Sequence, residues 1–102
     1  MGMTPEGKVK AAVKKWLREH GAWFCMPMGT QFGQSGVPDF VCCIGGRFLA
    51  IETKAPGKRN NTTVLQKQQI ASIHEALGMA LVVDDAAQLD EFFGVRKDAN
   101  QT

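Results

Sequence analysis

Two adjacent glycines between two apolar runs constrain the fold of this chain more than any other feature. Gly45-Gly46 separates the run Asp39–Ile44 from the run Arg47–Lys54, and both runs are rich in aliphatic and aromatic residues. A glycine pair readily takes the positive φ angles of a two-residue turn, so we expect an antiparallel hairpin. Because each strand is almost continuously apolar, we also expect a sheet that is covered on both faces.

The open end of this hairpin brings ionisable residues together. With a two-residue turn Ile44 faces Arg47, and counting outward along both strands places Asp39 opposite Glu52. Directly opposed Cβ atoms are about 4.5–5.5 Å apart, and two carboxylates there repel unless a cation lies between them or one is protonated. Lys54, two residues beyond Glu52, projects from the same face. Such oxygen ligands suit Mg²⁺ or Mn²⁺, so the hairpin predicts a metal site with a lysine beside it.

Each half of this motif also has a simpler interpretation. Asp39 follows a proline at the start of a strand, and Glu52, Thr53 and Lys54 can fray into solvent at the end of one. A longer turn or a β-bulge would shift the register and separate the carboxylates. The pairing of both halves across one hairpin favours the site.

Two helices are expected, one on each side of the hairpin in sequence. The first begins at Thr4-Pro5-Glu6, which supplies an N-cap hydroxyl, a first-turn proline and an acid, and it ends at Gly21. The second is capped by Thr62 or Thr63 and runs to about Leu77.

Each helix has a polar residue in its first turn on the face that packs against the sheet. Glu6 precedes apolar residues of its stripe by seven and eleven positions, as Gln66 precedes Ile73 and Leu77. We therefore predict that both polar side chains reach the site. The alternatives are that Glu6 only complements the helix dipole and that Gln66 only completes a capping box with Thr63.

The other segments complete an α/β domain with a central mixed sheet flanked by helices. We expect further strands at Ala22–Met26 and Met79–Val83, and a short closing helix at Ala86–Phe93. Pro27–Pro38 is rich in glycine and is expected to be a long loop, a kind of segment that is often functional. The order α-β-β-β-α-β-α follows.

Size and composition indicate a soluble globular protein. At 102 residues, with 44% hydrophobic and 22% charged residues, the chain suffices for one core, and we expect a single domain over 1–95 with a flexible tail at 96–102. No apolar run approaches the roughly 18 residues of a membrane span, and the N-terminus lacks the apolar region of a signal peptide. We therefore expect no membrane association and a cytoplasmic location.

The three cysteines do not suggest a disulfide framework. Cys25, Cys42 and Cys43 are an odd number without C-x-x-C spacing, so we expect buried thiols in a reducing compartment. The neighbours Cys42 and Cys43 should point to opposite faces of their strand. Structural zinc is not expected, because His20 and His74 are not at finger spacing.

The net charge of +2 is too mild to indicate a partner by itself. Basic residues crowd the first helix and the loop after the hairpin, whereas acidic residues gather near the C-terminal end. This gradient permits an anionic ligand, although a lysine-rich helix is ordinarily just a solvated face.

The motif resembles that of a known nuclease superfamily. Gly36-Val37-Pro38-Asp39, twelve residues and then Glu52-Thr53-Lys54 resemble the PD-(D/E)-x-K signature. Glu6 and Gln66 match accessory positions of one branch, the virus-type replication-repair nuclease (VRR-NUC) domain. The resemblance extends from Glu6 to about Val83 and is to a stand-alone form of that domain.

The resemblance implies a restriction-endonuclease-like fold and a catalytic metal ion. Mg²⁺ or Mn²⁺ would be bound by Asp39, Glu52 and the backbone carbonyl of Thr53, with Glu6 contacting it directly or through water. Lys54 would orient or help deprotonate the attacking water and stabilise the charge on phosphorus. The chemistry is that of metal-ion catalysis. Gln66 would position either Lys54 or the scissile phosphate.

The resemblance also implies a substrate and an assembly. Stand-alone members resemble Holliday-junction resolvases and are found in viruses and bacteria, which would place the protein in bacterial or infected-host cytoplasm. Symmetric incision of a four-way junction needs two sites, so we expect a homodimer that binds branched DNA. Phosphate contacts are expected from Lys8, Lys14, Lys15, Lys58 and Arg59.

Two alternatives remain at this level. One is a DNA-junction binding module without activity, and the other is a flap or duplex nuclease of the same superfamily. The intact set of Asp39, Glu52 and Lys54 argues against the first, because binding alone does not need opposed carboxylates.

Overall fold

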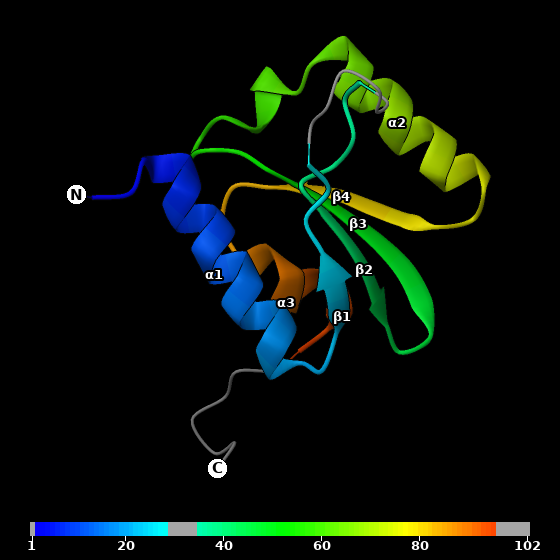
Figure 1. The fold of residues 1–102 in the computed structure, drawn as a ribbon, viewed down its shortest axis with the longest axis horizontal. Helices are drawn as coiled ribbons and strands as arrows, with labels where there is room; N and C mark the ends of the chain where they lie inside the picture. Colours follow the sequence, from blue (N-terminus) through cyan, green and yellow to red (C-terminus); the bar gives the residue numbers. More distant parts are fainter. Residues whose placement is uncertain (1, 29–34, 96–102) are drawn as a thin grey trace.

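The computed structural model describes residues 2–28 and 35–95, and it confirms the predicted order of elements. Figure 1 shows these elements, which are α1 (Pro5–Glu19), β1 (Trp23–Cys25), β2 (Phe40–Ile44), β3 (Arg47–Thr53), the 3₁₀ turn η1 (Arg59–Asn61), α2 (Val64–Glu75), β4 (Met79–Val83) and α3 (Ala87–Phe93). The predicted tail at 96–102 and part of the predicted loop lie outside the described residues. No helix in the two described ranges is both long and apolar enough to span a membrane.

The sheet has four strands in the order β1-β2-β3-β4. The first three strands are antiparallel, and β4 runs parallel to β3 after a crossover through α2, so the sheet is mixed as predicted. Gly45 and Gly46 take φ angles of 57° and 78°, as the two-residue turn requires. The predicted register is confirmed from Ile44–Arg47 to Phe40–Ile51.

One face of the sheet carries the hydrophobic core. Helix α1 buries Val9, Val13, Trp16 and Leu17 against it. In Figure 1, α1 and α3 lie on this side of the sheet. The indole N–H of Trp16 donates to the buried carboxylate of Asp90 at 2.8 Å, which joins α3 to α1 with a hydrogen bond inside the core.

The opposite face is covered only in part, which corrects the prediction of a sheet buried on both sides. Helix α2 packs beside β4 on that face, yet none of its residues is fully buried. The rest of this face is open to solvent, with Trp23 on β1 63% exposed and Phe48 on β3 44% exposed. An apolar run predicts that a strand is buried, but it does not determine how much of each face a helix covers.

The second helix also ends earlier than predicted. It stops at Glu75, and Leu77 takes a positive φ of 69° with 92% of its surface exposed. Leu77 is therefore not part of the packing face, whereas Ile73 is half-buried there. The apolar spacing continued beyond the point where the backbone leaves the helix.

The cysteines divide between two environments, which corrects the prediction that all three are buried. Cys25 and Cys43 are exposed on the open face, and Cys42 is buried in the core. The opposite orientation of Cys42 and Cys43 is as predicted. Burial, with a smaller contribution from nearby Cys25, raises the pKa of the Cys42 thiol to about 12, so this thiol stays protonated and unreactive.

Candidate active site

Asp39 lies immediately before β2, which begins one residue later than the predicted strand Asp39–Ile44. Its Oδ2 accepts two hydrogen bonds from Thr53, at 2.9 Å from the backbone N–H and at 2.6 Å from the hydroxyl. The regular pairing of the hairpin ends at Phe40 and Ile51. Asp39 is therefore joined to β3 through Thr53, and the predicted pair of Asp39 with Glu52 is not part of the regular ladder.

Glu52 is 4% exposed, an unusual environment for a carboxylate. Its Oε2 accepts a hydrogen bond from Nε2 of Gln66 at 2.8 Å and lies 3.6 Å from Nζ of Lys54. Its Oε1 is buried and accepts no hydrogen bond from any described residue. A buried acceptor without a partner costs about 1–3 kcal/mol or more, so this atom marks a place where a charged partner would be strongly favoured.

The electrostatics connect the two carboxylates. The pKa of Glu52 is raised from 4.5 to about 7, chiefly by burial and next by the charge of Asp39, while the positive charge of Lys54 opposes both. Glu6 makes a smaller contribution that also raises this pKa. The three acids therefore interact electrostatically, although their oxygens hydrogen-bond to different groups. A cation among them would favour the ionised form of Glu52.

Gln66 makes the hydrogen bonds of the capping box and also contacts Lys54 and Glu52. The side-chain Oε1 of Gln66 accepts from the backbone N–H of Thr63 at 2.9 Å. The backbone N–H of Gln66 donates to the Thr63 hydroxyl at 3.1 Å, which completes the capping box. The same Oε1 accepts from Nζ of Lys54 at 2.9 Å, while Nε2 donates to Glu52. Helix α2 is thus capped by the side chain that orients Lys54 and Glu52.

A close backbone contact fixes the loop that carries Asp39 against the same turn of α2. Gly36 has a φ of 75°, and a Cβ built on it would lie 2.6 Å from the carbonyl carbon of Leu65. Nε2 of Gln69 donates to the carbonyl of Ser35 at 3.2 Å beside this contact. Only glycine fits such an approach, so the Gly36-Val37-Pro38-Asp39 segment depends on it for its position.

Glu6 reaches the site from α1 together with a lysine that sequence reasoning missed. Lys10 Nζ lies 3.3 Å from Oε2 of Glu6 and 3.9 Å from Oδ1 of Asp39. Lys10 is four residues after Glu6, a spacing that places two side chains on one helical face, so the pair could have been found from the sequence. The contact of Lys10 with Asp39 could not, because it depends on how α1 docks.

The donor set fits a divalent ion, with few protein ligands. Among residues 2–28 and 35–95, no three carboxylate, imidazole or thiol side chains converge as a complete metal cage. Mg²⁺ keeps several waters and is usually held by one or two carboxylates, which matches Asp39 and the unpaired Oε1 of Glu52. The predicted roles of Glu6 and of the Thr53 carbonyl as further ligands stay predictions.

The basic residues expected to contact DNA lie on α1 and at the start of η1. Lys14 is half-buried on α1 and Lys15 is exposed there, while Lys58 and Arg59 are exposed at the start of η1. Arg59 Nε lies 3.5 Å from Oδ1 of Asp84, so part of its charge is already neutralised.

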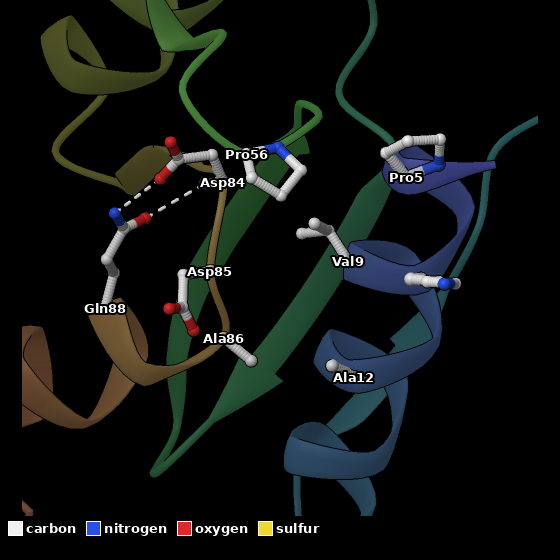
Figure 2. Close-up of a pocket in the computed structure, with 9 residues that line it drawn as sticks. Pro5, Val9, Ala12, Pro56, Asp84, Asp85, Ala86 and Gln88 are labelled. Atoms are coloured by element: carbon white, nitrogen blue, oxygen red, sulfur yellow. Dashed lines mark hydrogen bonds between the residues drawn. The ribbon is translucent and has the colours of Figure 1, made fainter.

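Lys8 lines a groove of about 570 Å³ between α1 and the segment that leads into α3 (Figure 2). The groove has an apolar wall on α1, at Val9 and Ala12, and a polar wall where Asp84 and Gln88 hydrogen-bond to one another. Hydrogen bonds from the Gly57 N–H and Gln88 lower the pKa of Asp84, so it stays anionic.

The four-stranded mixed sheet, flanked by helices and carrying two acids and a lysine at the open end of its central hairpin, is a restriction-endonuclease-like fold. In a comparison with solved structures, it matches one described as a VRR_NUC domain, with a TM-score of 0.72 and 22% sequence identity. The match covers 93% of this chain and 100% of the other, so the chain has the VRR_NUC fold that its motif predicted. By sequence, no family model and no curated protein matches it.

Proposed function

We propose that this protein is a metal-dependent DNA endonuclease that hydrolyses phosphodiester bonds in branched DNA, with the four-way junction as favoured substrate. The observation that carries the proposal is the convergence of Asp39, Glu52, Lys54 and Gln66 at one end of the hairpin, in a fold shared with a VRR_NUC domain. A sheet end that only bound DNA would not need a buried carboxylate with an unpaired oxygen.

The chemistry divides among the side chains as follows. Attack of water on phosphorus breaks a P–O bond and places negative charge on the phosphoryl oxygens. Lys54, held by Gln66 and Glu52 and 12% exposed, offers a fixed positive charge to those oxygens. A Mg²⁺ or Mn²⁺ ion bound by Asp39 and Glu52 would lower the pKa of a bound water and neutralise developing charge. Glu6 would help to bind or orient the hydrated ion.

A homodimer is part of the proposal, because paired incision of a junction needs two sites. The exposed aromatic side chains of Trp23 and Phe48 support it, since they lie on the open face and an apolar surface of this kind often mediates association. Light scattering with and without junction DNA tests the assembly. A monomer under both conditions contradicts the dimer but not the nuclease.

The decisive experiment incubates the protein with labelled four-way junctions, flaps and linear duplex in Mg²⁺, Mn²⁺ or EDTA. We expect cleavage of the junction with either metal and none with EDTA. Asp39→Ala and Lys54→Ala should retain DNA binding and lose at least about 100-fold in cleavage rate. Exposed Lys67 on α2, outside the site, provides the matched control Lys67→Ala, which should cleave normally.

The outcomes separate the alternatives. Binding of junctions without cleavage in either metal favours the non-catalytic binding module. Preferential cleavage of flaps or duplex keeps the nuclease and changes its substrate. Cleavage that survives both Asp39→Ala and Lys54→Ala rules out the proposed site.

A further inference from the structure

Lys10 is a cation positioned between two acids of the candidate site. Its Nζ is 3.3 Å from Oε2 of Glu6 and 3.9 Å from Oδ1 of Asp39, and its side chain is 35% exposed. The acids are 43% and 23% exposed, so water screens these interactions only in part. A protonated lysine at such distances offsets much of the negative charge that would attract a metal ion.

The hydrogen bonds of Asp39 determine which of its oxygens a cation can use. Oδ2 accepts both the N–H and the hydroxyl of Thr53, whereas Oδ1 faces Lys10. A metal ion that approaches this carboxylate from its free side therefore meets the ammonium of Lys10. Two cations at one oxygen repel strongly, so one must withdraw when the other binds.

We propose that Lys10 competes with the divalent metal ion for Asp39 and Glu6, and so sets how tightly the metal is bound. The inference rests on the proposed metal site. Lys10 suits this role because it is a flexible point charge held by two long ion pairs. Lys54, in contrast, is hydrogen-bonded at 2.9 Å to Gln66 and is far more shielded, so it stays in place when the metal binds.

The test measures Mn²⁺ binding to the DNA-free protein by calorimetry at low salt, without reference to cleavage. Lys10→Met should bind Mn²⁺ about fivefold or more tightly than the wild type, because a nearby positive charge is removed. Lys10→Arg keeps the charge and should bind within about twofold of wild type. Lys67→Met removes an exposed positive charge outside the site and should leave affinity unchanged. The advantage of Lys10→Met should shrink at high salt.

The results distinguish failure of this inference from failure of the site. If Lys10→Met binds Mn²⁺ no more tightly than wild type while Asp39→Asn loses binding, the metal site stands and competition by Lys10 is wrong. If Asp39→Asn binds as wild type does, or no variant binds Mn²⁺, both the metal site and the inference fail. Lys10→Gln is a second neutral variant should Lys10→Met not fold.

Discussion

Helices α1 and α2 begin alike and are held in the fold by different interactions. Both are capped by a threonine and both bring a polar first-turn residue, Glu6 or Gln66, to the site. Helix α1 buries four residues in the core, whereas α2 buries none completely and is tied down at its first turn by hydrogen bonds. Packing of α1 therefore contributes more to the free energy of unfolding, whereas the arrangement of the site depends mainly on α2.

The largest expected effect tests the structural side of this comparison. Leu17→Ala on α1, at a position with no exposed surface, should lower the free energy of unfolding by about 2–5 kcal/mol. The matched change on α2, Ile73→Ala at a half-buried position, should cost about 1 kcal/mol. Urea unfolding followed by circular dichroism measures both, and equal losses would remove the distinction between the helices.

The next effect concerns the glycine that meets the first turn of α2. Gly36→Ala should cost about 1–3 kcal/mol, because the new Cβ meets the backbone at Leu65 while φ stays positive. It should also lower cleavage, since Asp39 moves with the loop.

The control for this variant is Gly45→Ala, at a positive φ of 57° with no atom near the added Cβ. It should cost about 1 kcal/mol and leave cleavage intact. Similar activity for both alanine variants would contradict the positioning role of Gly36.

A smaller effect separates capping from the chemistry at α2. Thr63→Ala removes one half of the capping box and should cost about 1 kcal/mol of stability with little change in cleavage. Gln66→Ala removes the other half and frees Lys54 and Glu52 as well, so cleavage should fall about 10–100-fold at similar stability. Thermal unfolding and junction cleavage on the same samples decide this, and parallel losses in both variants would mean that Gln66 acts only as a cap.

A last comparison concerns a pH dependence that comes from Glu52, on the α2 side of the sheet. Because the pKa of Glu52 is raised from 4.5 to about 7 on folding, the folded protein holds a proton that the unfolded chain has released between these values. Glu52 therefore contributes stability at low pH that is lost as the pH rises through about 7. Melting temperatures between pH 4.5 and pH 8 in EDTA should fall less for Glu52→Gln than for wild type.

Glu75→Gln, at an exposed position on α2, is the control for this measurement and should follow the wild-type slope. A Glu52→Gln profile that also follows wild type would show that Glu52 is not protonated in the fold near neutral pH.

Much of the site could be derived from the sequence because strict geometric periods place it. The glycine pair determines which residues of β2 and β3 pair, and the helical period puts Gln66 on the side of α2 that faces the sheet. These rules apply wherever the backbone is regular, and Glu52, Lys54 and Gln66 all lie in or next to regular elements.

The rest depends on features that no local pattern determines. The contact of Lys10 with Asp39 requires the docking position of α1, and the bonds from Thr53 to Asp39 require the path of the loop before β2. Exposure of Trp23 and Phe48 follows from the limited reach of α2 across its face of the sheet. In each case the determining quantity is the placement of one element relative to another.

The two-residue turn at Gly45 and Gly46 has a consequence for how the length of this hairpin can vary. Successive side chains on a strand alternate between faces, so the interval between Asp39 and Glu52 can change only in steps of two, with one residue added to or removed from each strand. A single inserted residue would reverse the facing of one acid unless a bulge absorbed it. Insertion of one residue in each strand therefore lengthens the hairpin and keeps the two acids on one face, whereas insertion of a single residue in one strand places them on opposite faces.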